Sequence, residues 1–290
     1  MNTLLLIDSH ALLHRFYHAL PPLTSPSGDA IHGVYGICGV LARILEGNGL
    51  ERPTYIAAAL DRPEPTFRKA MYTDYKIHRP VSADGLITQI KMLPAMFEAF
   101  GVKAISVAGF EADDVIGTLV ERFKKTPNLR IIILTGDHDV FQLVEDDRVV
   151  ADIIKSGMNN LTRYNEAAVL EKFGLPPSKL PDYKALVGDA SDNIKGAKGV
   201  GPETARKLLQ EFGSLETLYE DIGLVKRALA EKLLAEKETV FLSRTLSTIR
   251  RDVPIALDSL EHLRATPQKD KLHAFLTSLG FQSLMNRMAL

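Results

Sequence analysis

Acidic residues follow several apolar segments in this chain of 290 residues. Asp8 ends the segment TLLLID, Asp61 ends YIAAALD, and Asp137 and Asp139 follow IIILT. If these segments are parallel strands, their carboxyl ends share one edge of a sheet, where ligands bind. We therefore expect these carboxylates to meet at that edge. Because Asp137 and Asp139 are separated by a single residue, both would point the same way along an extended backbone.

Two further acidic groups lie at predicted helix or turn positions. Glu111, Asp113 and Asp114 stand where a helix begins, and acids are favourable there because a helix N-terminus carries partial positive charge. Capping alone needs fewer acids than this segment carries. Asp189 and Asp192 would share a face if the turn that contains them is helical.

Each acid taken alone is most simply a turn former or a helix cap, but the set argues for a shared role. Carboxylates gathered in one crevice repel and shift one another's pKa values unless divalent cations neutralise them. Oxygen ligands without His or Cys favour Mg²⁺ or Mn²⁺ over zinc, and two such ions can clamp the attacking and leaving oxygens of a phosphoryl transfer. The predicted chemistry is hydrolysis of a phosphodiester or phosphate ester. The acids are Asp8, Asp61, Glu111, Asp113, Asp114, Asp137, Asp139, Asp189 and Asp192.

Strand and helix patterns alternate over residues 1–180, which predicts an α/β fold with a mostly parallel sheet and helices on both faces. After residue 180 the strand signals fade, so we expect a helical region over 181–290. The predicted strands are Thr3–Asp8, Tyr55–Asp61, Val102–Val107 and Ile131–Thr135, with helices at Val34–Glu46, Leu86–Phe100 and Ala112–Lys124. The later predicted helices are Asp182–Val187, Pro202–Phe212, Ser214–Tyr219, Val225–Glu236 and Val240–Leu246.

Basic and aromatic residues interleave in the segment 62–85, which is too long for an ordinary connection and has no apolar periodicity. Cations pair with phosphates, and aromatic rings stack on bases in proteins that bind single strands. A solvated surface loop is the structural alternative. The residues concerned are Arg62, Phe67, Arg68, Lys69, Tyr72, Tyr75, Lys76 and Arg79.

A second basic segment surrounds the turn Gly199-Val200-Gly201-Pro202. Two glycines flanking an apolar residue predict a tight hairpin, and Pro202 suits the first turn of a helix, whose N–H groups can bind a phosphate. With Asp182–Val187 in the first helix, the segment has the form of a helix–hairpin–helix, which contacts the DNA backbone without reading sequence. The residues expected to contact DNA are Lys195, Lys198, Gly199, Gly201, Thr204 and Lys207.

The composition is that of a globular protein, with 46% hydrophobic and 24% charged residues and a net charge of −1. A single cysteine, Cys38, excludes an internal disulfide framework and a Cys-based zinc site. The apolar run Leu4–Ile7 is too short for a signal peptide or a membrane span, so we expect a cytoplasmic protein without a membrane partner. Neither Ser9 nor Cys38 has a recognisable paired base, so we expect no protein nucleophile.

Several segments, in order along nearly the whole chain, resemble the 5′-nuclease domain of bacterial DNA polymerase I, within the flap endonuclease family. They are LLLIDSHALLHRFYHALPPLTSPSG, FRKAMYTDYKIHRP, GFEADDVIGTLV, ILTGDHDVFQLV and DYKALVGDASDNIKGAKGVGPETARKLL. The resemblance implies a PIN-like (resolvase-like) fold and cleavage of 5′ flaps or stepwise removal from a 5′ end. It also implies a nucleoid-associated monomer, fused to or working with a DNA polymerase. Its substrates would be nicked or branched DNA and RNA primer–DNA hybrids, in replication and repair.

The resemblance also implies two Mg²⁺ ions, or Mn²⁺, and a K⁺ ion held by hairpin carbonyls near residues 191–201. The first metal and the catalytic carboxylates would be at Asp8, Asp61, Glu111 and Asp113. The second metal and its outer shell would involve Asp114, Asp137, Asp139, Asp189 and Asp192.

In the same family the segment near 62–85 forms a helical arch through which the 5′ strand threads. By this resemblance Lys76 and Arg79 would be catalytic, steering the scissile phosphate and stabilising its developing charge. Tyr75 would stack on a base, and Arg68 would bind phosphate.

The chain departs from the family pattern at a few positions. His138 stands between Asp137 and Asp139 where Lys is common, so the positive charge there depends on pH. Ser9 replaces a frequent Gly, and Lys195 and Ala197 replace the usual Pro and Val of the hairpin approach.

Three other functions fit part of the pattern. A PIN-like RNase shares the fold, but the helix–hairpin–helix suits duplex DNA. A catalytically silent junction-binding module would gain nothing from dense negative charge facing phosphate. A small-molecule phosphatase would leave both basic segments unexplained.

Overall fold

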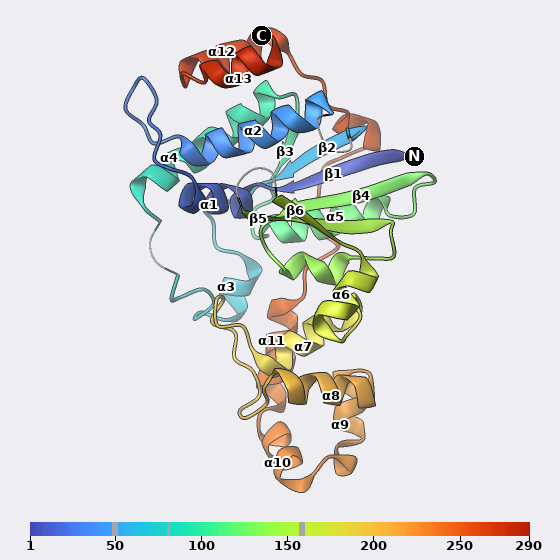
Figure 1. Cartoon of the computed structure of the whole chain (residues 1–290). Helices are drawn as coiled ribbons and strands as arrows, with labels where there is room; N and C mark the ends of the chain where they lie inside the picture. Colours follow the sequence, from blue (N-terminus) through green and yellow to red (C-terminus); the bar gives the residue numbers. More distant parts are fainter. Residues whose placement is uncertain (48–51, 80–81, 157–159) are drawn as a thin grey trace.

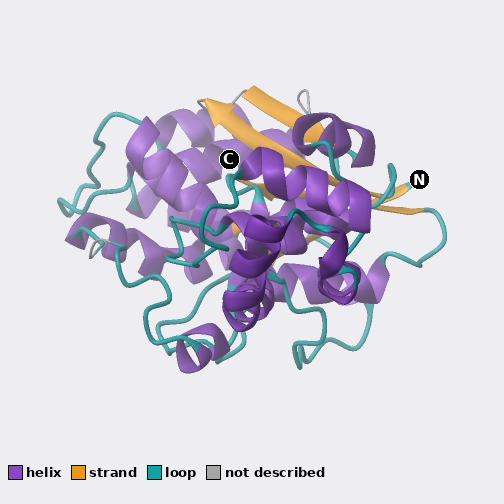
Figure 2. Ribbon diagram, turned by 90° about the horizontal axis from the view of Figure 1, so that it is seen from below, coloured by secondary structure: helices purple, strands orange, loops and turns teal. Residues whose placement is uncertain are grey.

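The computed structural model describes residues 1–47, 52–79, 82–156 and 160–290. An α/β body lies at the top of Figure 1 and a smaller helical unit lies below it. Figure 2, seen from below, shows helices and loops in front and the strands behind them. Among the described residues, no helix is both long and apolar enough to cross a membrane.

The body is built on a six-stranded sheet in the order β3-β2-β1-β4-β5-β6. All neighbouring strands are parallel except β6, which runs antiparallel to β5. This confirms the mostly parallel sheet and its predicted strands, whereas β5 and β6 were not predicted. The strands are β1 Asn2–Asp8, β2 Tyr55–Ala59, β3 Lys103–Ile105, β4 Leu129–Thr135, β5 Val149–Ser156 and β6 Asn160–Tyr164.

Side chains alternate along each strand, so both faces of the sheet carry apolar residues. Both faces are covered, as the sequence predicts. Leu5 and Ile7 of β1 belong to one apolar core, and Leu4 and Leu6 belong to the core on the opposite face. The first core is covered by helices α1 Ser9–Ala19, α2 His32–Glu46 and α4 Asp84–Ala99. The second is covered mainly by α5 Ala112–Phe123 and the 3-10 turn η1 Asp139–Leu143.

The helical unit has an apolar core of its own, which includes Leu175, Leu209 and Val240. A short helix, α6, and the turn η2 lead into it from the body. These connecting elements are α6 Glu166–Phe173 and η2 Pro177–Lys179, and the unit itself consists of α7 Leu180–Val187, α8 Pro202–Phe212, α9 Leu215–Glu220, η3 Ile222–Leu224, α10 Arg227–Ala235 and α11 Lys237–Ser247.

The last part of the chain returns from the helical unit to the body. Ile249 and Val253 join the core around α5, while Leu276 and Phe281 join the core around α2 and α4. Two short helices, α12 Lys269–Ser278 and α13 Gln282–Met288, therefore lie on top of the body in Figure 1, after the turn η4 Leu260–Leu263. Residues 181–290 are thus mostly helical but do not form one spatial unit.

Candidate active site

A cleft of about 240 Å³ lies at the carboxyl edge of the sheet. Its lining includes Asp8, Asp61, Glu111, Asp113 and Asp137. These acids come from the ends of β1, β2 and β4 and from the start of α5, which confirms the prediction that strand-end carboxylates meet there. A smaller adjoining pocket is lined by Asp113 and Asp137 together with Asp139 and Asp192. Asp113 and Asp137 therefore border both spaces.

Asp8 lies at the bottom of the cleft and is almost completely buried. Its Oδ1 accepts a hydrogen bond from the Ala11 N–H at 3.1 Å, which caps α1, and its Oδ2 accepts one from the Thr135 hydroxyl at 2.6 Å. Burial, with the nearby charges of Asp61 and Asp137, raises the pKa of Asp8 to about 7. The sequence gives no sign of Thr135 as the residue that orients this carboxylate.

Asp61 is held by two contacts that the sequence did not suggest. Its Oδ1 accepts a hydrogen bond from the Ala112 N–H at 2.7 Å, at the start of α5. Its own N–H donates to Nδ1 of His10 at 3.1 Å, and that ring also lines the cleft. Burial lowers the pKa of His10, so the ring is neutral near pH 7.

Asp113 combines an unsatisfied oxygen with a raised pKa. Its Oδ1 is buried without a hydrogen-bond partner among the described residues. Burial and the neighbouring acids, Asp8 foremost, raise the pKa of Asp113 well above its ordinary value. An orphaned carboxylate oxygen facing other acids is costly unless a cation completes its coordination.

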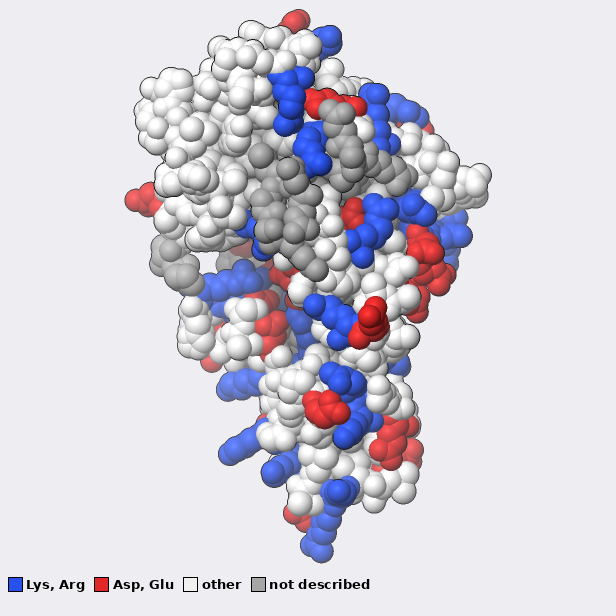
Figure 3. Space-filling model, in the orientation of Figure 1, with Lys and Arg blue, Asp and Glu red and all other residues white. Residues whose placement is uncertain are grey.

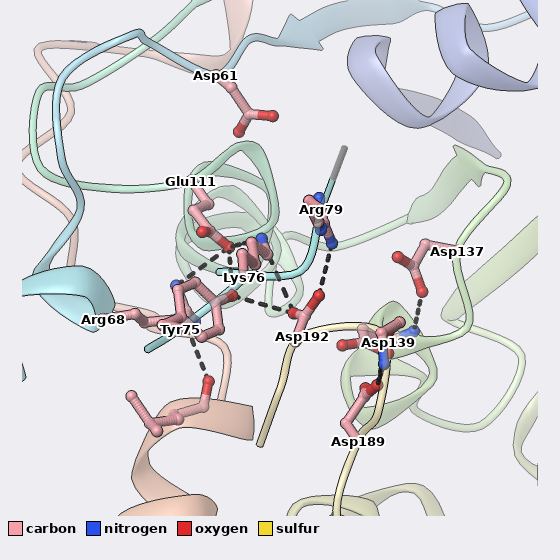
Figure 4. Close-up of polar contacts among 12 residues, drawn as sticks. Asp61, Arg68, Tyr75, Lys76, Arg79, Glu111, Asp137, Asp139, Asp189 and Asp192 are labelled. Carbon is pink, nitrogen blue, oxygen red and sulfur yellow. Dashed lines mark hydrogen bonds and ion pairs between the residues drawn. The ribbon is translucent and has the colours of Figure 1, made fainter. Parts of the chain in front are cut away.

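Asp137 and Asp139 do not point the same way, because the backbone between them is not extended. His138 has φ −89° and ψ −8° and is followed directly by η1, which Asp139 begins. The His138 ring stacks on Phe141 at 4.9 Å. Figure 4 shows Asp139 turned toward Asp189 and away from the cleft side that Asp137 lines.

Lys184 of α7 is a site residue that the sequence analysis missed. Its ammonium group forms ion pairs with Asp139 and, at 2.7 Å, with Asp189. Burial raises the pKa of Asp139 to about 6 even though Lys184 opposes the shift. Lys184 and the Ser191 hydroxyl outweigh burial at Asp189 and lower its pKa to about 2.

Asp189 and Asp192 lie in a turn and not in a helix, so the predicted shared face is absent. Asp189 and Ile194 exchange backbone hydrogen bonds of 2.8 Å that close the turn. Asp189 faces Lys184, whereas Asp192 faces the segment that follows α3 (Phe67–Met71). The two acids therefore serve different neighbours.

Lys76 and Arg79 lie among the acids in Figure 4. Lys76 Nζ is 2.9 Å from Glu111 Oε2 and 3.8 Å from Asp192 Oδ2, and Arg79 is 2.6 Å from Asp192. Both cations also line the cleft. Lys76 has a left-handed φ of 56°, and its N–H donates to the Asp192 carbonyl at 2.9 Å. Such backbone strain in a non-glycine residue is typical of functional sites.

Tyr75 is not placed to stack on a base, contrary to expectation. Its side chain is buried, and its hydroxyl oxygen lies 3.1 Å from both Glu111 Oε2 and Asp192 Oδ2, which share its single proton as acceptors. Burial raises the pKa of the phenol, so the hydroxyl remains a donor. In this structure Tyr75 links two acids of the site.

Arg68 was expected to meet a DNA phosphate, and its burial contradicts this. Only 3% of the residue is exposed, and its guanidinium binds both oxygens of Asp114 at 2.7 and 2.8 Å. The remaining donors reach the carbonyls of Leu246 and Thr248. Asp114 also accepts hydrogen bonds from the N–H groups of Glu111 and Arg250. Its oxygens are thus occupied, and this pair joins α3, α5 and the chain leaving α11.

The segment predicted as a helical arch contains little helix. Among its described residues, only the five-residue α3 is helical before α4 begins at Asp84, and turns occupy residues 73–78. Pro80 and Val81 lie outside the described residues. The described part of the segment lies beside the acids, between the body and the helical unit (Figure 1).

The predicted helix–hairpin–helix is present as α7, a connecting loop and α8. Gly196 is required by close approach, since a Cβ there would lie 2.3 Å from the Val187 carbonyl carbon. Lys195, Lys198 and Lys207 are exposed, together with the turn glycines. Thr204 is half-buried in the first turn of α8. Figure 3 shows Lys and Arg side chains projecting from the lower unit.

Comparison with solved structures identifies the class of fold. The 5′-exonuclease of phage T5, in a structure described as having bound divalent zinc, superimposes with a TM-score of 0.69 over 99% of this chain and 97% of that one, at 17% identity. The catalytic core of Rad2 in complex with DNA substrate superimposes with a TM-score of 0.63, covering 99% and 92% of the two chains at 16% identity. The fold is that of these nucleases.

Sequence comparison then defines the family. The model described as the N-terminal resolvase-like domain of 5′–3′ exonucleases matches residues 3–174, and the C-terminal SAM fold of the same family matches 175–271. The chain belongs to the 5′–3′ exonuclease family and is a phosphodiester hydrolase. DNA polymerase I of Caldicellulosiruptor bescii is 40% identical over 99% of the chain, and that of Thermus aquaticus is 36% identical over 99%. The chain spans about a third of the length of each, at 33%.

The donors at the cleft fit hard divalent cations. Within the described ranges, no three His, Cys, Asp or Glu side chains already converge as a ready-made metal site. Lys76, Arg79 and Lys184 are ion-paired with Glu111, Asp192 and Asp139. The orphaned oxygen of Asp113 beside Asp8 nevertheless gives an all-oxygen set of the kind that Mg²⁺ and Mn²⁺ prefer.

Proposed function

We propose that the chain is a structure-specific 5′ nuclease that hydrolyses DNA at 5′ flaps and 5′ ends with two Mg²⁺ or Mn²⁺ ions. One observation supports this most directly. The cleft is lined both by acids without a basic partner among the described residues, such as Asp113, and by the cations Lys76 and Arg79. Such a space accommodates a phosphodiester between metal ligands and charge-stabilising donors.

The proposed roles are those that the family resemblance implies for these residues. Asp8, Asp61, Glu111 and Asp113 would hold the first ion, while Asp137 and Asp139 would hold the second, with Asp189 and Asp192 in its outer shell. When bound, the two ions would lower the pKa of the attacking water and offset charge on the leaving 3′ oxygen.

Lys76 and Arg79 must exchange partners during the reaction. They now bind Glu111 and Asp192. A phosphate entering the cleft would take over these donors, and the released carboxylates would be free for metal. The donors would then stabilise the charge that develops on the scissile phosphate. Tyr75 and the Arg68–Asp114 pair would position this segment from below.

The helix–hairpin–helix would bind the duplex next to the flap. Its exposed lysines and turn N–H groups suit phosphate contacts, and a K⁺ ion at its carbonyls near residues 191–201 is part of the proposal. We place the enzyme in primer removal and DNA repair in the bacterial cytoplasm, beside or joined to a DNA polymerase. The identity of the relatives, which are DNA polymerases I, supports this assignment.

The test is cleavage of a 5′-labelled flap duplex in Mg²⁺, with EDTA and Asp137→Ala as controls. We expect a short labelled product near the junction that requires metal and is absent with the variant. Tight binding of the flap without any product in Mg²⁺ or Mn²⁺ would instead show a junction-binding module. Faster cleavage of the matching RNA single strand would favour a PIN-like RNase.

A further inference from the structure

The hairpin turn has a corner that is open to an anion. Gly199 has a left-handed φ of 81°, and a Cβ at Gly201 would meet nothing within 4 Å. Within the described part of the chain, neither glycine N–H has a backbone or side-chain acceptor. The Val200 N–H between them donates to the Ala197 carbonyl at 3.0 Å, so the two glycine N–H groups are the donors of this turn that an external anion can use.

A side chain from a distant helix lies against this corner. Lys232 of α10 places Nζ 3.3 Å and Cδ 3.8 Å from the position that a Cβ of Gly199 would take. A larger residue at 199 would therefore crowd the lysine. Position 199 thus favours glycine for two reasons: its backbone is left-handed, and a side chain there would contact Lys232.

The charge of Lys232 is uncompensated, unlike that of several neighbours. Arg206 is paired with Glu203 at 2.9 Å, and Arg227 is paired with Glu231 at 2.9 Å. Lys232 is exposed and has no carboxylate within 4.0 Å among the described residues. It is therefore a cation that is available to an external anion at the hairpin.

We propose that Lys232 is a phosphate-binding residue of the hairpin, so that α10 as well as the helix–hairpin–helix contacts duplex DNA. A phosphate at the corner would accept hydrogen bonds from the turn N–H groups and from the Lys232 ammonium group together. This inference rests on the proposed DNA-binding function of the hairpin. It adds a second element, 31 residues beyond Gly201, to the duplex-binding surface.

The test is the salt dependence of binding to a nicked duplex in EDTA, measured by fluorescence anisotropy between about 50 and 200 mM KCl. Loss of one phosphate contact lowers the slope of log affinity against log salt concentration by about 1. We expect this for Lys232→Ala, with several-fold weaker binding, and recovery in Lys232→Arg. Flap cleavage by Lys232→Ala should show a raised KM and an unchanged kcat.

Lys271→Ala is the control for loss of a positive charge outside the hairpin, because it removes an exposed lysine, paired with Glu98 at 2.9 Å, from α12 at the opposite end of the molecule. It should leave the slope unchanged, and both variants should melt at the wild-type temperature. A wild-type slope in Lys232→Ala, or an equal decrease in Lys271→Ala, would overturn the assignment of Lys232. If the wild-type protein itself shows no salt-dependent duplex binding, the failure belongs to the proposed hairpin function.

Discussion

The acids of the crevice fall into two groups, which differ in whether a basic side chain lies close enough to form an ion pair. The first group, Asp8, Asp61, Asp113 and Asp137, has no Lys or Arg within 4.0 Å among the described residues, and we call it the unpaired group. The second group, Asp139, Asp189 and Asp192, is neutralised by Lys184 and Arg79, and we call it the bridged group. Glu111 lies between them and binds Lys76.

This difference indicates where a cation is most needed. In the unpaired group, burial and mutual repulsion raise the pKa values of Asp8 and Asp113, so the folded protein disfavours their ionised forms. A divalent ion relieves that cost directly. In the bridged group a metal must compete with ammonium and guanidinium groups that are already in place. We therefore expect one tight and one weaker ion.

The largest predicted effect is on the rate of flap cleavage, which should fall far more when an acid of the unpaired group is replaced than when one of the bridged group is replaced. Asp113→Asn should lower single-turnover flap cleavage in Mg²⁺ by a factor of about 1,000 or more, since it removes a ligand of the tight ion. Asp189→Asn should cost about 10- to 100-fold, as expected for an outer-shell partner. DNA binding in EDTA is the control and should persist in both variants. Equal losses of cleavage activity in the two variants would show that the unpaired and bridged groups do not differ in catalysis.

The next effect tests whether Asp114 belongs to either group. Arg68→Ala leaves a buried carboxylate unpaired and should lower the free energy of unfolding by about 3–5 kcal/mol in urea titrations. Arg62→Ala, which breaks an exposed pair with Glu64, should produce no measurable change. An unchanged free energy of unfolding in Arg68→Ala would mean that the Arg68–Asp114 pair is not structural. Asp114 would then again be a candidate metal ligand.

The unpaired group should also make stability depend on pH in EDTA. The pKa of Asp8 is about 7 when folded and near 3.8 when unfolded, so the folded state holds the proton more tightly. Its contribution is complete below the unfolded pKa and is lost as pH rises through the folded pKa. Unfolding free energy should fall by about 2–3 kcal/mol between about pH 5 and 8.

Asp8→Asn should reduce the slope of this profile, because the amide does not titrate, while Asp113 and Asp139 still do. Thermal or urea unfolding in EDTA at each pH measures the difference. A wild-type profile that rises with pH over the same range, or one that Asp8→Asn leaves unchanged, would contradict the pKa assignment.

The smallest effect concerns the bridged group. Lys184→Gln removes the ammonium that competes for Asp139 and Asp189 while keeping a hydrogen-bond donor, so the weaker ion should bind several-fold more tightly. Mn²⁺ titration followed by electron paramagnetic resonance measures this. Lys125→Gln, on the surface after α5, is the control. Weaker binding of this ion in Lys184→Gln would show that Lys184 organises the ligands.

The sequence predicted the acids at the cleft because strand ends and helix starts have strong local signals. It did not reveal β5 and β6, partly because Asp152 faces Arg163 across the two strands at 2.8 and 2.9 Å. Charged residues in a strand weaken the apolar pattern, and their partner is known only after folding. The expectation that Asp137 and Asp139 point the same way likewise assumes an extended backbone. Instead, the 3-10 turn η1 begins at Asp139 and redirects its side chain.

Burial of polar residues was the main source of error. Arg68 and Tyr75 belong to a basic and aromatic segment that suggests nucleic-acid contact, yet their partners lie 46 and 117 positions away along the chain. Lys184 was overlooked for the converse reason, since a lysine in a helix is ordinarily a surface residue. Long-range pairing of this kind is not encoded in local periodicity.

The most direct test of the account is the number of divalent ions that the crevice binds and their relative affinities. Mn²⁺ titration of the whole chain, by calorimetry and electron paramagnetic resonance, should give two sites of unequal affinity. Asp8→Asn should abolish the tighter one and flap cleavage with it. A single Mn²⁺ site with full cleavage activity, or tight binding that survives Asp8→Asn, would contradict the two-ion crevice.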